Sequence, residues 1–486
     1  MPGSVSYEDA EVEPYMAVNP ANPSNLVGVW QQDRWSDGGA HGLVAGYSMD
    51  GGKTWKQNPL PFSVCASATG LGASYGRASD PWVSFSPDGS AVYAIAISFN
   101  GDTLQPGSNG GVFVVRSLDG GVNWSLPTAL ITSDEHAFND KESITADPHN
   151  SNYVYAVWDR LTDTGHGAAY FSRSIDGGAS WQPAVPIWDP GVGNQTIGNE
   201  IVSLTSGEIV DVFEEIDGSF GGPASASIRV IRSSDHGATW STPTTVAQNL
   251  AVGTQDPDAH AVIRTGAGLP QAAAGPGNEL VVVWQDARFS SGQRDGILLS
   301  RSMDGGLTWS APIQINTVPS TQAFTPSVAV LADGTMGVSY FDFRGNTPSL
   351  KTLPTDYWFV SSTDLMHWNE QHITGPFDLD LAPQAEGLFL GDYQALGVIG
   401  NVFVPFYVQT NSGSTLNRND AYFLPPQLMP LVLTQGVTQV VSPSYAPPPD
   451  AAFHQKVHEN LMRLLRSENP GWDKVREKLQ PAASPP

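Results

Sequence analysis

The segment Ser48–Trp55 reads SMDGGKTW, and near copies of it recur along the chain. The copies read SLDGGVNW at Ser117–Trp124, SIDGGASW at Ser174–Trp181, SSDHGATW at Ser233–Trp240 and SMDGGLTW at Ser302–Trp309, and a shortened copy, STDLMHW, ends at Trp368. Successive Trp residues are 57 to 69 positions apart. Self-similarity at such a period indicates repeated supersecondary units, so this motif decides the fold.

Each position of the motif suits a tight turn next to a packed surface. The Asp side chain accepts backbone hydrogen bonds within the turn, and Gly adopts positive φ angles without steric cost. The Trp side chain is large enough to fill the gap between neighbouring units. Five close copies and one degraded copy therefore indicate a repeated structural element.

The sequence upstream of each motif repeats as well. The first unit runs EPYMAV, the turn NPANPSN, LVGVWQQDR and then GLVAGYS before its motif, and a fourth short run follows the motif in later units, as in PAVPIW. Apolar runs this short, separated by turns rich in Gly, Pro, Asn and Asp, are typical of antiparallel strands, and four strands per unit are typical of a propeller blade. A seventh unit without the motif spans Gly391–Pro426. We therefore predict an all-β, seven-bladed β-propeller with a short C-terminal helical tail, and six blades as the alternative because the fifth unit is irregular at its start.

The repeated motif is identified as an Asp box, also called a BNR repeat. Over roughly residues 13–426 the chain resembles the sialidase-like (neuraminidase-superfamily) β-propellers. The resemblance implies that the motif lies at the outer edge of each blade, between its third and fourth strands and far from the active site. It implies a structural role for Asp50, Asp119, Asp176, Asp235 and Asp304. Asp boxes also occur in polysaccharide lyases and lectin-like propellers, so the resemblance selects no single function.

The composition fits one large β domain followed by a different tail. The chain has 486 residues, of which 40% are hydrophobic, with 50 Gly, 38 Pro and 14 Trp. We expect an N-terminal extension at 1–12, the propeller at 13–441, a Pro-rich linker at 442–449 and a helical tail at 450–486. In the tail, Asp450 resembles an N-cap and apolar residues follow at helical spacing from Phe453 to Leu465. This stripe predicts a helix packed on the propeller, with self-association through the helix as the alternative.

The net charge of −25 disfavours nucleic acid and anionic membranes as partners. It also repels acidic glycans at long range unless local Arg residues compensate. No segment is long enough to span a membrane, and the lone Cys65 excludes an internal disulfide. The chain opens without a signal-peptide pattern. Because bacterial Asp-box proteins are usually exported, we expect the mature form of a secreted or periplasmic protein.

Acidic residues stand just before the first apolar run of most units, where the loops at one end of a propeller converge. They are Glu13, Asp80, Glu142, Glu200, Asp258 and Asp392, and Thr325 interrupts the series. We expect them to ring the mouth of the central channel, where crowded carboxylates raise one another's pKa and favour a general acid. The same carboxylates are suitable ligands for Ca²⁺, or they simply cap the strands and hydrate the channel.

Four Arg residues follow the second run of their units, and each comes after an Asp. They are Arg34, Arg160, Arg288 and Arg344. Arg binds carboxylates through two parallel hydrogen bonds, so these residues are candidates for substrate binding. Alternatively, each Asp–Arg pair only fixes its own loop.

The resemblance suggests roles for several of these residues. Sialidases bind the substrate carboxylate with three Arg residues, and they use an Asp as acid/base and a Tyr activated by Glu as nucleophile. By this resemblance Arg34, Arg288 and Arg344 form the clamp, Asp80 is the acid/base, and Tyr393 is the nucleophile with Glu200 or Glu386. The Arg-Ile-Pro triplet of sialidases is absent, because EPYMAV stands in its place, and seven blades depart from the six of sialidases. We predict an exo-acting glycoside hydrolase of sialidase-like type that acts on a glycan and requires no cofactor.

Two further functions remain open. Some seven-bladed Asp-box propellers are uronate polysaccharide lyases, in which Arg neutralises the carboxylate and His or Tyr removes the neighbouring proton. His166, close to Arg160 in sequence, and Tyr393 suit that chemistry. The other function is a non-catalytic propeller that binds a glycan or a protein.

Overall fold

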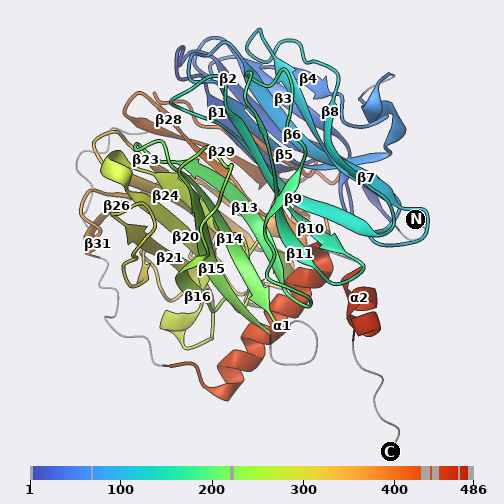
Figure 1. Ribbon diagram of the computed structural model, residues 1–486. Coiled ribbons are helices and arrows are strands. Elements are labelled where there is room, and N and C mark those ends of the chain that lie inside the picture. The colour runs from blue at the N-terminus through green and yellow to red at the C-terminus, as the bar shows by residue number, and fades with distance from the viewer. Residues whose placement is uncertain are drawn as a thin grey trace, which may run out of the picture.

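The computed structural model describes residues 4–66, 69–218, 224–427, 438–439, 448–468 and 471–479. Within these ranges the secondary structure is mostly β, and the α-helices are α1 (Ala451–Glu468) and α2 (Trp472–Leu479) (Figure 1). None of the helices in the described ranges is long and apolar enough to cross a membrane. A mostly-β chain with a helical C-terminal segment agrees with the predicted fold class.

The first four groups of strands are antiparallel and follow one another along the chain. They are β1 (Ser6–Val18), β2 (Leu26–Trp35), β3 (Ala40–Ser48) and β4 (Lys56–Leu60); β5 (Arg77–Phe85), β6 (Val92–Asn100), β7 (Asn109–Ser117) and β8 (Thr128–Ser133); β9 (Ala137–Ala146), β10 (Val154–Thr162), β11 (Gly167–Ser174) and β12 (Val185–Trp188); and β13 (Gln195–Ser203), β14 (Ile209–Asp217), β15 (Ser225–Ser233) and β16 (Thr244–Asn249).

Three further groups complete the β part of the described chain. They are β19 (Gln271–Ala274), β20 (Leu280–Asp286), β21 (Gly296–Ser302) and β22 (Ile313–Gln314); β23 (Ala323–Val330), β24 (Met336–Asp342), β25 (Pro354–Ser362) and β26 (His367–Asp378), to which β31 (Thr438–Gln439) adds; and β28 (Ala395–Ile399), β29 (Val402–Thr410) and β30 (Asn419–Phe423).

The first strands of successive groups contact one another. The contacts run from β1 to β5, β9, β13, β19, β23 and β28, and β28 in turn contacts β1. A parallel bridge between Ala10 of β1 and Asn419 of β30 also joins the first group to the last. The beginning and the end of the β region therefore lie side by side, as the blue and orange ribbons show (Figure 1).

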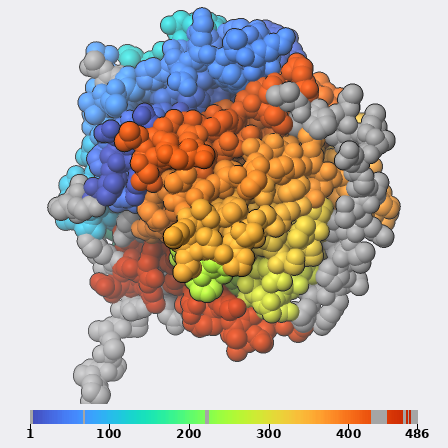
Figure 2. Space-filling view, turned by 180° about the vertical axis from the view of Figure 1, so that it is seen from behind, coloured from blue at the N-terminus to red at the C-terminus, as the bar shows by residue number. Residues whose placement is uncertain are grey.

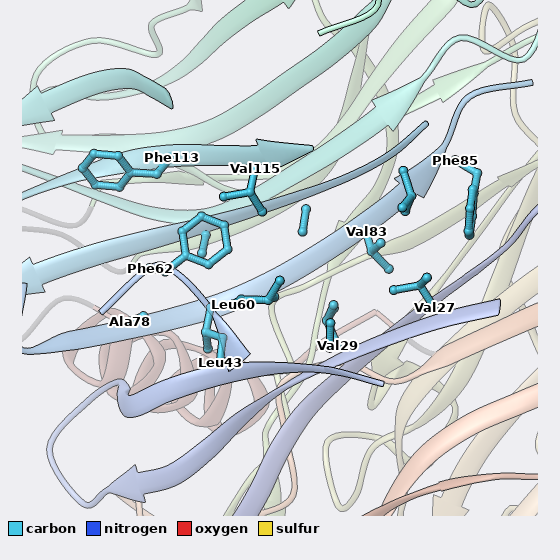
Figure 3. Packing of buried hydrophobic residues seen from close by; sticks show 14 of the residues in the cluster. Val27, Val29, Leu43, Leu60, Phe62, Ala78, Val83, Phe85, Phe113 and Val115 are labelled. Atoms are coloured by element: carbon cyan, nitrogen blue, oxygen red, sulfur yellow. The ribbon is translucent and has the colours of Figure 1, made fainter. Parts of the chain in front are cut away.

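Most strands are buried on both faces because each group packs between two neighbours. Val27 and Val29 of β2 and Val83 and Phe85 of β5 belong to one cluster of buried apolar side chains between the first two groups (Figure 3). Strands covered on both faces are apolar throughout rather than alternating, as in VVVW of β20, where every residue is buried. This packing explains why the apolar runs of the sequence stand out so clearly.

The repeated motif forms a compact turn between the third and fourth strands. In the first copy, Asp50 Oδ1 accepts hydrogen bonds from Ser48 Oγ at 2.9 Å and from the Thr54 amide at 2.9 Å. Gly52 has a φ of 82°, and a Cβ atom there would collide with Phe423 of the last group. The motif thus needs Gly both for its backbone conformation and for close contact with the adjacent group.

Two boundaries differ from those expected. The first strand begins at Ser6, so part of the predicted N-terminal extension at 1–12 is strand. The fifth group begins at Gln271, after an insertion that contains β17 (Thr254–Gln255) and β18 (Val262–Arg264). Asp258 therefore lies in the insertion and not before an innermost strand, where it accepts hydrogen bonds from Asn346 and Ser349. The strand β18 pairs in parallel with β27 (Leu388–Phe389).

The helix α1 packs against strands of the same chain. Asp450 accepts a hydrogen bond from the Phe453 amide at 2.8 Å, which confirms the predicted N-cap. Phe453, Val457 and Leu465 are buried in a cluster with apolar residues of the third, fourth and fifth groups. The C-terminal segment, in red, lies along one edge of the molecule (Figure 2). The predicted linker at 442–449 lies outside the described residues, apart from Pro448 and Pro449.

Candidate functional site

The first strand of a group contains a β-bulge in five of the groups, at β1, β5, β9, β13 and β23. At each bulge, two consecutive residues of the first strand stand opposite one residue of the second strand. The first residue of each bulge has a positive φ: Glu13 at 54°, Asp80 at 54°, Lys141 at 49°, Gly198 at 67° and Thr325 at 47°. Positive φ is costly for a residue other than Gly, and such strain concentrates at functional sites.

The positions of the bulges show that the expected ring of acidic residues is wrong in the third and fourth groups. The residue equivalent to Glu13 and Asp80 in the third group is Lys141, not Glu142, and in the fourth group it is Gly198, not Glu200. Glu142 is buried, and burial raises the pKa of its carboxyl well above the usual value. Glu200 accepts a hydrogen bond from the Ala272 amide of the fifth group at 3.1 Å, and burial raises its pKa to about 8.

The bulges and the start of the last group bring together a buried ionic cluster. Lys141 Nζ lies 2.7 Å from Asp80 Oδ1, 2.9 Å from Asp392 Oδ2 and 3.5 Å from Glu13 Oε1. Arg264 of β18 donates from Nε to Asp392 Oδ1 at 3.1 Å and from Nη2 to Asp392 Oδ2 at 2.5 Å. The Lys141 ammonium thus lies between Glu13, Asp80 and Asp392, which the sequence indicates as suitable Ca²⁺ ligands. In the described ranges, no group of three or more His, Cys, Asp or Glu side chains is arranged to hold a metal ion.

Two carboxyl groups of the cluster have opposite pKa shifts. Burial and the neighbouring charge of Asp80 raise the pKa of Glu13 to about 8. Burial also opposes ionisation of Asp392, but the nearby charges of Arg264 and Lys141 outweigh it and hold the pKa of Asp392 well below its usual range. At neutral pH Glu13 is therefore mostly protonated, and the two cations of the cluster, Lys141 and Arg264, face the two carboxylates of Asp80 and Asp392.

Arg34 lies beside this cluster but is not paired with it. Its side chain donates from Nη1 to Gln31 Oε1 at 3.0 Å and lies over the ring of Phe389 at 5.0 Å, and Arg264 lies over the same ring at 4.7 Å. Arg34 is only 2% exposed, yet it forms no ion pair with any described residue, and its Nε has no hydrogen-bond partner there. A buried guanidinium without an ion-pair partner is costly, which favours an anionic ligand beside it.

Arg34 and three residues of the ionic cluster, Asp80, Lys141 and Arg264, line one pocket. It has a volume of about 590 Å³, part of which is open to solvent, and it is lined by charged, aromatic and small residues, among them Arg34, Asp80, Phe99, Phe138, Lys141, Arg264 and Glu386. Glu386 precedes β27 and is exposed in the pocket wall, where partial burial raises the pKa of its carboxyl. Charged groups that converge on a concave site with aromatic walls are typical of ligand-binding pockets.

Other predicted site residues lie outside this pocket. Tyr393 is buried, packs edge-on against the stacked rings of Tyr15 and Trp82, and donates a hydrogen bond to the Pro81 carbonyl at 3.2 Å. Burial and the charges of Glu13 and Asp80 raise the pKa of Tyr393 well above its usual value, which is the opposite of activation as a nucleophile.

The four Arg residues of the repeat do not form one clamp. Arg288 pairs with Asp286 at 2.7 Å, and Arg344 pairs with Asp342 at 2.7 Å and with Glu370 at 2.8 Å. These two residues therefore fix their own loops, as the alternative interpretation held.

The residues suggested for a lyase lie elsewhere. Arg160 donates to Asn139 Oδ1 at 2.8 Å and lies over Tyr170. His166 lies at the turn after β10, where it pairs with Asp189 at 2.8 Å and remains 39% exposed. The pocket that contains Arg34 is lined by neither residue.

Sequence reasoning missed Lys141 and Arg264. Two signals in the sequence mark Lys141. Basic residues are scarce in the body of the chain, and Lys141, rather than Glu142, aligns with the acidic residue that begins the first apolar run in other units. Arg264 lies in the insertion before the fifth group, which follows no repeat, so no sequence signal marks it.

No protein-family model matches the chain. Among solved structures, it is similar to an α-L-arabinanase of Penicillium chrysogenum in complex with arabinobiose, at 16% identity and a TM-score of 0.47, over 69% of this chain and 92% of that one. It is similar to a leech intramolecular trans-sialidase, at 13% identity and a TM-score of 0.44, over 70% of this chain and 66% of that one. An ulvan lyase matches at 12% identity and a TM-score of 0.38, over 68% of this chain and 80% of that one. At these identities and TM-scores, no residue role transfers to the present chain.

Proposed function

We propose that the chain is a seven-bladed, carbohydrate-active β-propeller and that the Arg34 pocket is the active site of an exo-acting glycoside hydrolase. The seven groups of strands are its blades, and the contacts from β1 round to β28 and back support a closed ring. The substrate is a glycan whose terminal sugar carries a carboxylate. By analogy with exported glycosidases, the protein is secreted or periplasmic.

The unpaired Arg34 carries this proposal. A guanidinium that lines a pocket, is 2% exposed and has no ion-pair partner in the described chain is stabilised when a carboxylate binds next to it. Arg264 and Lys141 line the same pocket but are already neutralised in part by Asp392 and Asp80. Arg34 is therefore the principal contact for the carboxylate of the sugar.

Two carboxyl groups of the pocket fit the chemistry of glycoside hydrolysis. That reaction needs an acid to protonate the leaving oxygen and a carboxylate to attack the sugar or to activate water. Glu386, whose pKa is raised, is assigned as the acid. Asp80, held by the Lys141 ammonium at 2.7 Å, is assigned as the carboxylate. This assignment differs from the predicted one, in which Asp80 is the acid/base and Tyr393 is the nucleophile with Glu200 or Glu386.

Fluorogenic glycosides test the proposal. We would assay 4-methylumbelliferyl glycosides of N-acetylneuraminic acid and glucuronic acid, with uncharged arabinofuranosides and galactosides for comparison. The wild type should hydrolyse an acidic glycoside, and Glu386→Gln and Asp80→Asn should each lower kcat by about 10²–10⁴-fold. Glu208→Gln, which removes a surface carboxylate paired with Arg232, is the matched control and should retain activity.

Each other outcome has a clear meaning. Turnover like that of the wild type in both Glu386→Gln and Asp80→Asn would overturn the assignment. Release of an unsaturated sugar, detected near 235 nm, would show a lyase, and binding of an acidic glycan without turnover would show a lectin-like propeller.

A further inference from the structure

A second cavity adjoins the Arg34 pocket. It encloses about 370 Å³ and shares Arg264, Glu386 and Ser467 with the first pocket. Its other walls come from the insertion at 253–267 and from one face of α1, at Asn460, Arg463 and Leu464. Glu386 therefore stands at the boundary between two adjoining cavities.

The helix α1 is held firmly at this place. Leu461 and Leu465 are buried against the strands, and Asn460 Nδ2 donates to the carbonyl of Ala251, just before the insertion, at 3.3 Å. Two turns further along the helix, Arg264 Nη1 donates to the Ser467 carbonyl at 3.5 Å. The last two turns of α1 thus form a fixed wall that joins both cavities.

Arg463 stands out among the basic residues of this helix. Arg466 pairs with Asp473 at 3.1 Å, and Lys456 donates to the Gly292 carbonyl at 2.8 Å. Arg463 is half-buried in the wall of the second cavity and forms no hydrogen bond or ion pair with any described residue. Burial lowers the pKa of its guanidinium, and the nearby carboxyl groups of Glu459 and Asp295 offset this only in part. An anion bound in the cavity would stabilise the charge further.

We propose that the second cavity is the subsite for the leaving-group sugar and that Arg463 binds a carboxylate on that sugar. This inference rests on the proposed function, because a general acid must reach the oxygen that joins the two sugars. Glu386 has the required position between the cavities. The substrate is then an oligosaccharide with carboxylates on two neighbouring sugars, and Arg34 and Arg463 compensate locally for the net charge of −25.

The test compares leaving groups in the full-length protein. Two pairs of probes share a terminal acidic sugar: sialyllactose with α2,8-linked disialic acid, and p-nitrophenyl galacturonide with digalacturonate. Arg463→Ala should lower kcat/KM for the probe with the acidic leaving group by about 10–100-fold and leave its partner within about 3-fold of the wild type. Arg463→Lys should recover part of the loss. Lys456→Ala, on the same helix but outside both cavities, should change neither probe.

An equal loss on both probes of a pair, or no loss on either, would overturn the subsite. Thermal unfolding of Arg463→Ala identifies a general structural defect, and Arg463→Gln provides a second variant if Ala destabilises the helix. If the wild type hydrolyses none of the probes, the proposed function fails. Calorimetric titration with disialic acid and digalacturonate then still tests the subsite, because weaker binding by Arg463→Ala supports it and unchanged binding refutes it.

Discussion

Arg34 and Arg344 occupy the same place in their repeat units but differ in what they bind. Arg344 donates to Asp342 and Glu370 and lies 3.6 Å from the ring centre of Trp358. Two carboxylates of the protein therefore neutralise its charge. Among the described residues, Arg34 has only Gln31 as a hydrogen-bond partner, and it lines the pocket. The same position of the repeat therefore holds one Arg that is paired within its own loop and one that, under the proposed function, binds the substrate.

The spacing between Asp and Arg explains the difference. Asp342 is the last residue of β24 and accepts the Arg344 amide two positions on, a turn that lets the guanidinium fold back onto the same carboxylate. Asp33 and Arg34 are adjacent within β2, and their side chains have different partners: Asp33 Oδ1 accepts the Asp9 amide at 2.8 Å, and Arg34 donates to Gln31. Asp286 and Arg288 follow the first pattern, and Asp159 and Arg160 follow the second.

Removal of Arg344 should have the largest effect. Arg344→Ala leaves Asp342 and Glu370 without their cation in a mostly buried setting, and we expect a loss of about 3–5 kcal/mol in the free energy of unfolding. Chemical denaturation followed by Trp fluorescence measures it. Turnover per folded molecule should be unchanged, and a specific loss of turnover at normal stability would break the comparison.

Removal of Arg34 should lower activity without lowering stability, the opposite of the effect expected for Arg344. Arg34→Ala should lower kcat/KM for an acidic glycoside by about 30–1000-fold, which corresponds to about 2–4 kcal/mol of transition-state binding. Stability should be unchanged or higher, because a buried charge without an ion pair is removed. Arg160→Ala, which has the same Asp–Arg spacing but lies outside the pocket, is the control and should retain activity.

The pH dependence of stability tests the raised pKa of Glu13, which belongs to the ionic cluster beside Arg34. Because the pKa of Glu13 is raised to about 8, its contribution to stability is complete below the unfolded pKa of about 4.5 and is lost as the pH rises through about 8. The melting temperature of the wild type should therefore fall more between pH 5 and pH 9 than that of Glu13→Gln. Differential scanning fluorimetry of both proteins across this range is sufficient, and parallel curves would contradict the raised pKa.

The smallest effect should come from the outer turns. Asp176→Ala removes hydrogen bonds from Ser174 and Ser180, and we expect the melting temperature to fall by about 2 °C. Activity should not change, because the motif lies between the third and fourth strands and outside both cavities. Loss of activity at an unchanged melting temperature would show that the motif belongs to the site.

Much of the fold followed from local sequence. The turn of Asp50 and Gly52, the strand order around it and the Asp450 cap depend on contacts within a few residues, so their patterns are visible in the chain. The strand register at the bulges was not visible in this way. A one-residue shift exchanged Lys141 for Glu142, because a bulge changes which side chain faces the channel without changing the apolar pattern.

The sequence by itself determined the repeated units, their strands and the candidate Arg residues, because short-range hydrogen bonds and apolar periodicity encode these features. Only the tertiary structure decided which charges meet. Lys141 joins Asp80 and Asp392 from three different groups of strands, and Arg264 and Arg463 reach the pockets from an insertion and from the C-terminal helix. Whether a charge is paired or left for a ligand depends on distances between residues that are remote in the chain, and no local pattern contains those distances.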